Sequence, residues 1–380
     1  MNDFEATLRD SLKTAEAGYA PSDAAGALER FLARRRRRRI VRVAGAALAA
    51  GAAVVAVVTF LQPDAVVERR RPVQSVPTAS PGRSVVTGTF DLGPDLSDVE
   101  VFDDTVYVAH SNGAEVLFVD PETGEWFGRI SHRMGDVPSS MAIADGALFG
   151  INNISGTLDK YELPSGRPAE PVDRVPLGAE ATGVVVGGGS VWVASSAPEG
   201  PADRYVVRRF DAETLEELAT VEVPAIANLD YGFGSLWAGT SQGLFRLDPS
   251  TDESSRIGDV GSVSDVSVGA GGVWVYQSPA RGLEAEVLRI DPQGSVAQRT
   301  SVRGFFGEVT ADDVDGIWVL NSTSEFEKQV IRIDPASGSV LGAAIDLEGS
   351  IMEIASGAGA AWVVEDSQGM LTRVEVRSSG

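Results

Sequence analysis

A short hydrophobic phrase that recurs through the C-terminal three quarters of the chain restricts the fold more than any other feature. It is a glycine-rich turn followed by β-branched residues around one aromatic residue, as in "GGGSVWVASS" at 187–196 and "GAGGVWVY" at 269–276. The phrase occurs seven times, and its aromatic positions are Tyr107, Phe149, Trp192, Trp237, Trp274, Trp318 and Trp362. They are spaced 37 to 45 residues apart, the length of one four-stranded propeller blade. We therefore expect an all-β, seven-bladed β-propeller over residues 84–380, with these aromatic side chains packed between the sheets.

A second signature follows most copies of the phrase and marks where a strand must stop. It appears as "FVDPETG" (118–124), "RLDPST" (246–251), "RIDPQG" (289–294) and "RIDPASG" (332–338), with "RFDAET" (209–214) as a variant. Proline has no N–H to donate to a strand ladder, and an aspartate before it can cap the turn that follows. The signature predicts a turn between the third and fourth strands of each blade.

The seventh repeat lacks its own fourth strand, because the chain ends soon after "LTRVEV" (371–376). A matching segment stands at the other end: "VVTGTFDLG" (85–93) resembles "VLGAAIDLEG" (340–349) from the sixth repeat. If 84–92 pairs with the last repeat, both ends of the chain close the ring and no sheet edge is left open. We expect this closing strand.

The N-terminal part has a different composition. Residues 43–61 carry no charge, and a helix of that length is about 28 Å long, which matches the hydrocarbon thickness of a bilayer. Arg34–Arg39 and Arg42 precede this run, so the positive-inside rule places the N-terminus in the cytoplasm. We expect a cytoplasmic amphipathic helical tail at 1–39, a transmembrane helix at 40–62, a Pro-rich linker at 63–83 and an extracytoplasmic propeller.

A permanent anchor has two alternatives, a cleaved signal peptide and export by the twin-arginine route. A cleaved signal peptide would need a short basic region and a small-residue cleavage site, and neither is present here. Export by the twin-arginine route stays open, because "RRRIVR" (37–42) loosely fits its arginine pair and the apolar run is rich in alanine and glycine. The tail is interpreted either as a docking element for a cytoplasmic protein or as a basic topogenic segment.

The charge balance excludes one class of partner. Residues 84–380 hold 18 Lys and Arg against 46 Asp and Glu, a balance of −28, whereas residues 1–83 hold 14 against 8. A propeller this acidic repels phosphate backbones, so we expect no nucleic-acid partner. The chain has no cysteine, which removes disulfides, thiolate chemistry and cysteine-ligated zinc.

The phrases "VWVA" (191–194) and "RIDPASG" resemble the YVTN and virginiamycin-lyase-like β-propellers, over roughly 290 residues. That resemblance implies the fold. The lyase-like members carry histidine and glutamate around a magnesium site near the axis, in later blades. This chain has no histidine after His132, so we do not expect their activity.

The arginine run and the alanine-rich segment resemble single-pass membrane proteins of high-GC actinobacteria. Some of these are encoded beside extracytoplasmic-function sigma factors and are anti-sigma-like. The histidine and cysteine zinc motif of many anti-sigma domains is absent, because the first histidine is His110.

Candidate site residues are few. His110 directly follows a core strand and is a candidate for the axial channel, although a structural role is favoured; Asn112, Asn152 and Asn321 are the other candidate ligand-binding residues. The acidic stretches 91–104 and 312–316, the latter with Asp312, Asp313 and Asp315, could hold Ca²⁺ or Mg²⁺. Because 312–316 aligns with hairpin turns of other repeats, turn-forming aspartates are the favoured interpretation there, and no resident cofactor is expected.

These observations favour a non-enzymatic function. We expect a membrane-anchored propeller that binds a protein, peptide or cell-envelope ligand and relays its presence to a cytoplasmic partner such as a sigma factor. The alternative is a metal-dependent lyase or hydrolase that acts at the propeller axis.

Overall fold

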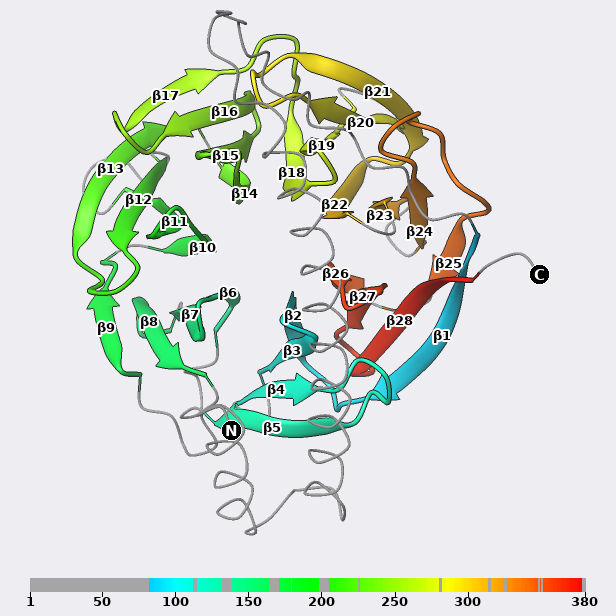
Figure 1. The fold of residues 1–380 in the computed structure, drawn as a ribbon, viewed down its shortest axis with the longest axis horizontal. Helices are drawn as coiled ribbons and strands as arrows, with labels where there is room; N and C mark the ends of the chain where they lie inside the picture. Colours follow the sequence, from blue (N-terminus) through cyan, green and yellow to red (C-terminus); the bar gives the residue numbers. More distant parts are fainter. Residues whose placement is uncertain are drawn as a thin grey trace, which may run out of the picture.

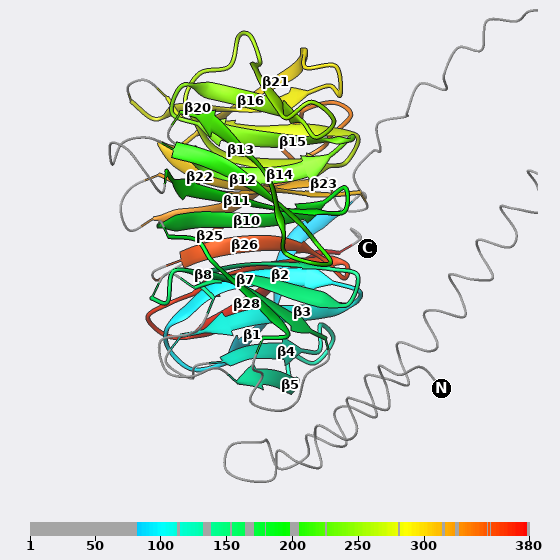
Figure 2. The same ribbon diagram turned by 90° about the vertical axis from the view of Figure 1, so that its left-hand side faces the viewer.

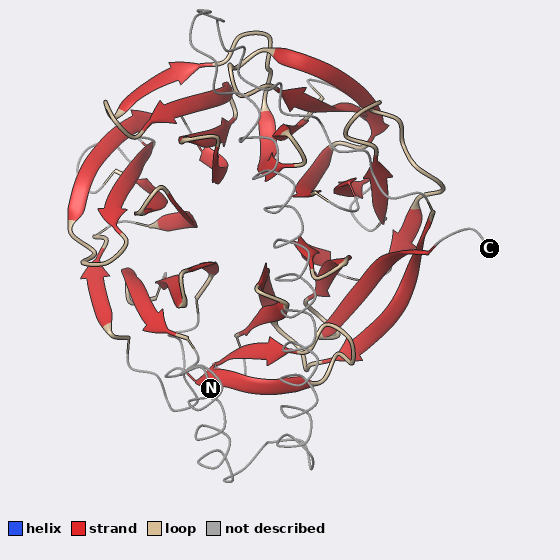
Figure 3. Cartoon of the chain, in the orientation of Figure 1, coloured by secondary structure: helices blue, strands red, loops and turns tan. Residues whose placement is uncertain are grey.

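The computed structural model describes residues 82–377, except for 112–114, 132–137, 153, 164–170, 179, 198–204, 225, 280–281, 314–315, 324–326, 348 and 350. The described residues form seven four-stranded antiparallel sheets around a central axis (Figure 1). Among them there are strands and loops and no helix (Figure 3). The prediction of an all-β, seven-bladed propeller is confirmed.

Each blade runs outward from an inner strand beside the axis, and the blades follow one another in chain order. From the axis outward, the first blade contains β2 (Leu96–Phe102), β3 (Thr105–His110), β4 (Glu115–Val119) and β5 (Trp126–Ser131); the second β6 (Ser140–Ala144), β7 (Ala147–Asn152), β8 (Thr157–Glu162) and β9 (Asp173–Pro176); and the third β10 (Ala181–Gly187), β11 (Ser190–Ser196), β12 (Tyr205–Asp211) and β13 (Glu217–Val223). The fourth blade contains β14 (Ile226–Gly232), β15 (Ser235–Thr240), β16 (Gly243–Asp248) and β17 (Glu253–Arg256), and the fifth β18 (Val263–Gly269), β19 (Gly272–Gln277), β20 (Glu284–Ile290) and β21 (Val296–Arg303). The sixth blade contains β22 (Phe306–Asp312), β23 (Gly316–Ser322), β24 (Lys328–Ile333) and β25 (Ile345–Leu347), and the seventh β26 (Ile351–Gly357), β27 (Ala360–Glu365), β28 (Met370–Arg377) and β1 (Arg83–Asp91).

The ring is closed by strands from both ends of the propeller. In the seventh blade β1 lies outside β28, antiparallel to it, from Arg83 opposite Arg377 to Asp91 opposite Met370. The ring of Phe90 lies 6.5 Å from that of Trp362, so the closing strand also packs on the core of its blade. The predicted closing strand is confirmed, and it leaves the seventh sheet with the same four strands as the others.

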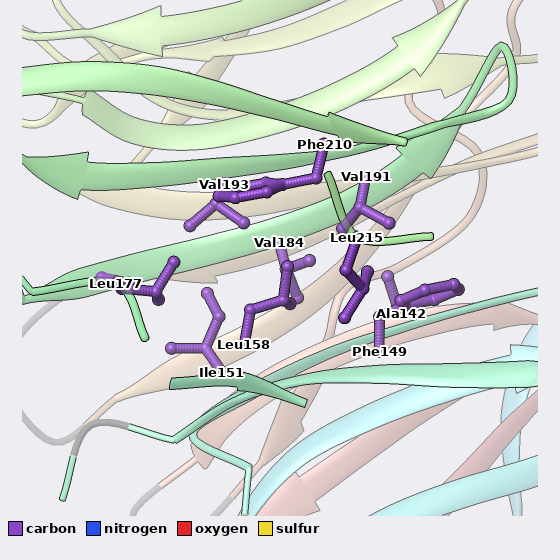
Figure 4. Close-up of a cluster of buried hydrophobic side chains, with 11 residues drawn as sticks. Ala142, Phe149, Ile151, Leu158, Leu177, Val184, Val191, Val193, Phe210 and Leu215 are labelled. Carbon is purple, nitrogen blue, oxygen red and sulfur yellow. The ribbon is translucent and has the colours of Figure 1, made fainter. Parts of the chain in front are cut away.

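The aromatic residue of each repeat lies in the second strand of its blade and is buried, with at most 4% of its surface exposed. Apolar residues of neighbouring blades pack face to face around these strands. Figure 4 shows one such cluster between the second and third blades, where Phe149 and Leu158 of one sheet face Val191 and Phe210 of the next. Burial of apolar surface between sheets therefore joins the blades, as alternating inward-facing residues predict.

Four of the five tryptophans in this set donate a hydrogen bond from the indole nitrogen to the carbonyl five residues earlier, in the hairpin before the second strand. For Trp274 the acceptor is the carbonyl of Gly269, at 3.1 Å; Trp192, Trp237 and Trp362 do the same at 3.2 Å. In the sixth blade that hairpin is longer, and the indole nitrogen of Trp318 has no partner among the described residues.

The Asp-Pro signature forms the turn between third and fourth strands. Oδ1 of Asp248 accepts hydrogen bonds from the backbone N–H and the hydroxyl of Ser250, at 2.8 and 2.6 Å. Asp120, Asp211, Asp291 and Asp334 accept backbone N–H groups in the corresponding way. The prediction that the aspartate caps this turn is confirmed.

A cationic side chain on the third strand reaches from most of these blades to the next. Arg209 lies 5.1 Å from the Trp192 ring centre and donates to the Pro249 carbonyl of the following blade, at 2.5 Å. Arg246, Arg373 and Lys160 contact the carbonyls of Pro292, Pro121 and Ala212 in the same manner. We call these four side chains the cation clamp. Arg332 reaches the Gly82 carbonyl, where the seventh blade has the start of β1 in place of an Asp-Pro turn.

The predicted tail, membrane span and most of the linker lie in residues 1–81, outside the described residues. Within the described part of the chain, no helix has the length and apolar character needed to cross a membrane.

Candidate functional site: the acidic axial channel

A cavity of about 430 Å³ lies among the inner strands. Figure 1 looks down the axis on which β2, β6, β10, β14, β18, β22 and β26 converge, and Figure 2 shows β2, β10, β14, β22 and β26 from the side. The described residues that line the cavity include five carboxylates and no lysine, arginine or histidine: Asp98, Glu100, Asp230, Asp265 and Glu353. The cavity lining is therefore rich in acidic groups, with no basic side chain among its described residues.

The carboxylates occupy equivalent places in the blades. One residue of each inner strand pairs with the residue two positions after the core aromatic, for example Asp98 with Ala109 and Asp265 with Tyr276. We call this set the inner ring; in blade order it is Asp98, Ser140, Gly183, Asn228, Asp265, Glu308 and Glu353. Four of its seven members are acidic.

Five inner-ring side chains join their inner strand to the next one. Asp98 accepts the Met141 N–H at 2.7 Å, and Asp265 accepts the Val309 N–H at 2.6 Å. Ser140 and Glu308 accept the N–H groups of Val184 and Ile354 in the same direction. Asn228 adds a side-chain bond to Asp265 of the following blade. The ring thus supplies acceptors for backbone donors that face the channel, where an unpaired N–H would be costly.

A second acidic level lies two residues further along, opposite the core aromatic. Glu100 pairs in register with Tyr107, and Asp230 with Trp237. Asp230 accepts the Val268 N–H of the next blade at 2.5 Å and the Tyr231 N–H at 2.6 Å. Because side chains alternate along a strand, Asp98 and Glu100 extend from the same side of β2.

Enclosure between the inner strands makes the charged forms of these groups unfavourable. Burial raises the pKa of Asp98 and of Asp265 to about 7, that of Asp230 to about 6 and that of Glu308 to about 8. Burial also raises the pKa of Glu100 and Glu353 well above its usual range, and neighbouring carboxylates add to the effect. The backbone N–H bonds act in the opposite direction but do not outweigh the burial.

Repulsion links the six carboxylates into one system. Glu353 is repelled by Glu308, Asp98, Asp265 and Glu100, while Asp230 repels Asp265 and Glu100. The ammonium group of Lys328 on β24 favours the charged form of Glu308, but it donates its own hydrogen bond to the Ile351 carbonyl. One carboxylate oxygen of Glu308 is enclosed and accepts no hydrogen bond from a described residue.

These groups can attract cations, since carboxylate and hydroxyl oxygens are acceptors for ammonium and guanidinium groups. They are spread over five inner strands and two levels. Among the described residues, no three acidic or histidine side chains converge in an arrangement that could hold a metal ion. The geometry therefore suits an extended positive group better than a single compact ion.

The candidate ligand-binding residues of the sequence lie elsewhere. Asn152 is the last residue of β7 and Asn321 the last but one of β23, and each is at most 2% exposed. Asn152 accepts the N–H groups of Ile154 and Ser155, while Asn321 accepts the Tyr276 hydroxyl at 2.6 Å. Both amides thus have local partners, and Asn112 is outside the described residues.

His110 does not line the cavity. Its Nδ1 lies 3.6 Å from the Glu115 carboxylate, which also forms a 2.8 Å ion pair with Arg129. The histidine and both partners belong to the first blade, away from the inner ring.

The candidate metal ligands are at a hairpin. Asp312 ends β22 opposite Gly316, and Asp313 accepts the N–H of Ala270 in the preceding blade at 2.7 Å. Asp315 lies outside the described residues. The described part of this stretch is a turn that contacts its neighbour blade.

The sequence interpretation included Asp98 and Glu100 within an acidic stretch but missed Asp230, Asp265, Glu308 and Glu353. A signal was present: the inner-ring residue stands nine residues before the core aromatic in six repeats and ten before it in the sixth. Superposing the repeats at that offset would have shown four acidic residues at one position.

Comparisons with known proteins identify the fold but no family or activity. No known family profile matches the chain, and no curated protein sequence matches it. The β-propeller domain of Cps50 (Swd1) from Myceliophteria thermophila is similar, with a TM-score of 0.59 and 14% identity over 77% of this chain and 100% of that one. Streptogramin B lyase has a TM-score of 0.58 and 14% identity, over 77% of this chain and 98% of the lyase. A hydrazine synthase chain from Kuenenia stuttgartiensis has a TM-score of 0.56 and 13% identity, over 75% and 96%.

The likeness to streptogramin B lyase agrees with the propeller class that the repeat phrases resemble, at the level of the fold. Altogether 882 solved chains match, and those described above include a streptogramin B lyase and a hydrazine synthase chain. A fold shared this widely does not single out an activity, so the function has to be argued from the channel.

Proposed function

We propose that this chain is a membrane-anchored, non-enzymatic binding protein whose propeller captures a positively charged segment of a protein, peptide or cell-envelope ligand in its axial channel. The observation that carries the proposal is the channel itself, where five carboxylates from four blades line one cavity without a cation among the lining residues. A ligand with ammonium or guanidinium groups would relieve the repulsion and find acceptors on two levels. The cavity of about 430 Å³ lies in the range of small-ligand sites.

The anchor completes the proposal. The apolar run at 43–61 and the arginines before it support an N-terminus in the cytoplasm and a propeller outside it. In this arrangement the tail at 1–39 contacts a cytoplasmic protein, such as a sigma factor, and the span connects it to the ligand-binding propeller.

Ligand binding is tested with the full chain in detergent micelles and a hexalysine peptide as the probe. We expect saturable binding, measured by calorimetry, that weakens with added salt and is absent for hexaglutamate. The double variant Asp98→Asn, Asp265→Asn should bind at least about tenfold more weakly, because two channel charges are lost. Glu253→Gln on the exposed outer strand β17 removes a charge away from the channel and should bind like the parent. Equal affinity of all three chains would remove the channel as the binding site.

The same calorimetric experiment distinguishes the proposed function from the alternative, a metal-dependent lyase or hydrolase. It requires a divalent site, so tight binding of Mg²⁺ or Ca²⁺ without binding of hexalysine would replace the proposed function by the enzymatic one.

The topology is tested by labelling, which the absence of cysteine makes simple. A single cysteine at exposed Ser254 should react with a membrane-impermeant maleimide on intact cells, whereas one at Ser11 should react only after lysis. The opposite pattern would invert the proposed orientation. Crosslinking of the full chain, compared with a chain that lacks residues 2–33, tests for the cytoplasmic partner; identical crosslinked proteins would remove the relay.

A further inference from the structure

The inner ring differs from an ordinary acidic surface because its carboxylates also join the blades. Asp98, Asp265 and Glu308 each accept a backbone N–H of the next inner strand, and Asp230 does so at the second level. A change in the charge of these groups is therefore a change at the contacts between neighbouring inner strands as well as in the field of the channel.

The charged groups that face one another in the channel can be named strand by strand. β2 contributes Asp98 and Glu100, β14 Asp230, β18 Asp265, β22 Glu308 and β26 Glu353, while β6 and β10 contribute none. Behind the inner strands, Lys328 of β24 is the one cation that acts on a channel carboxylate in the described structure. Positive charge is thus confined to one side of the ring and does not balance the six acids.

Such a set cannot be fully ionised without strong mutual repulsion. Protons are the smallest cations that can relieve it, and a cationic ligand is the alternative. Protons and ligand therefore compete for the same negative charge.

We propose that the inner ring is a proton-responsive element that sets the affinity of the channel for its cationic ligand, so that the ligand is held at mildly alkaline pH and released at mildly acidic pH. This inference rests on the proposed function and adds its regulation. On acidification the carboxylates take up protons from water, the channel loses negative charge, and their carbonyl oxygens continue to accept the N–H groups of the next blade. When the pH rises, the protons leave to water, and the positive charges of the bound ligand then relieve the repulsion among the carboxylates. For each positive charge of the ligand that binds in the channel, up to one proton is released to water.

The pKa directions agree with this behaviour. Burial holds the pKa of Asp98, Asp265 and Glu308 between about 7 and about 8, so the ring changes charge in the neutral range, whereas exposed carboxylates stay ionised there.

The first measurement follows the carboxyl groups without any ligand. The full chain, labelled with ¹³C at the carboxyl carbons of Asp and Glu, is titrated in micelles from about pH 4 to about pH 9. We expect a group of resonances that titrate between about pH 6 and about pH 8. Asp98→Asn removes a charge that raises the pKa of Glu100, Glu308 and Glu353, so their resonances should shift to lower pH, while Glu253→Gln should leave them in place. Titration of every carboxyl below about pH 5.5 would overturn the inference.

The second measurement follows hexalysine binding to the same chain at about pH 5.5 and about pH 8. We expect affinity at least about tenfold higher at the higher pH, and a smaller ratio in Asp98→Asn. Binding with the same affinity at both values, together with neutral-range titration, would overturn the regulation and leave the proposed function standing. Neutral-range titration without binding at either pH would instead overturn the proposed function and the inference that depends on it.

Discussion

Neighbouring blades of this propeller are joined at two radii by opposite kinds of charge. Further from the axis, Arg209 stacks on Trp192 and donates to the Pro249 carbonyl of the next blade. At the axis, Asp98 and Asp265 accept backbone N–H groups of the next blade. The cation clamp separates its positive charges by whole blades and gives each a carbonyl partner, whereas the inner ring brings like charges together around one cavity.

The two sets of charged groups differ in how well their surroundings stabilise the charge. A guanidinium over an indole face, with a carbonyl at its end, is stabilised where it stands. A carboxylate among five others is not, even when it accepts a good hydrogen bond, because burial and repulsion oppose ionisation. The outer contacts therefore stabilise the charges that they hold, whereas the inner carboxylates form good hydrogen bonds in surroundings that oppose their charge.

The largest expected effect comes from opening the ring. Deletion of Ser84–Leu92 removes nearly all of β1, the contact of Phe90 with Trp362 and the partner of β28, so the seventh sheet loses its outer strand. We expect an unfolded or oligomeric protein by light scattering and circular dichroism. A deletion of equal length at 73–81, before the strand, is the control. A monomer with unchanged melting after the first deletion would show that the ring does not depend on β1.

The second largest effect is expected from the inner ring, whose charge changes with pH. The pKa values of Asp98, Asp230, Asp265 and Glu308 lie above those of the unfolded chain, which are near 4, so the folded state holds more protons between about pH 4 and about pH 8. The free energy of unfolding must then fall as pH rises through this window. We expect a melting temperature about 5 °C lower at pH 8 than at pH 5. Asp265→Asn should reduce that difference.

A melting temperature that rises from pH 5 to pH 8 would contradict this sign. Hexalysine offers an internal check, because a bound cation should raise the melting temperature at pH 8 more than at pH 5.

The third effect isolates the cation clamp. Arg246→Ala removes the stacking on Trp237 and the hydrogen bonds to Ser235 and to the Pro292 carbonyl, so we expect a loss of about 2 kcal/mol in unfolding free energy. Arg299→Ala is the control, since its ion pair with Glu286 is partly exposed and its hydrogen bond to the Asp259 carbonyl is exposed, and their loss should cost less than about 1 kcal/mol. Urea unfolding at one pH measures both. Equal losses would mean that the clamp contributes no more than a surface ion pair.

The smallest effect compares two blades that differ in one hairpin. Trp274 and Trp318 are both buried, but only Trp274 donates to a hairpin carbonyl among the described residues. Trp274→Phe should therefore cost about 1 kcal/mol more than Trp318→Phe, because it leaves the Gly269 carbonyl without its indole donor. Urea unfolding of the two variants measures the difference. A larger loss for Trp318→Phe would show that packing, and not this hydrogen bond, separates the blades.

Several features were predictable because they depend on residues close together in the chain. The spacing of Trp192, Trp237 and Trp274 predicts the blades, and the aspartates before proline predict the turns that they cap. The closing strand was predictable because 85–93 repeats the pattern of another outer strand, and an open edge needs a partner.

The acidic lining of the channel was not predicted, because its residues lie on five separate strands, each at least one repeat from the next. Asp265 and Val309 are 44 residues apart and meet only once two inner strands stand side by side. The choice of His110, Asn152 and Asn321 followed the ends of strands, whereas the charges gather along the inner strands. Turn chemistry alone could not show that difference.

By itself the sequence determined the number of blades, their turns and the closure of the ring, because strand alternation, glycine-rich hairpins and Asp-Pro stops act over a few residues and recur in each copy. Only the tertiary structure decided which acidic residues meet. Closing seven blades into a ring brings one position of every inner strand to a shared axis, and at that distance water no longer screens the charges from one another.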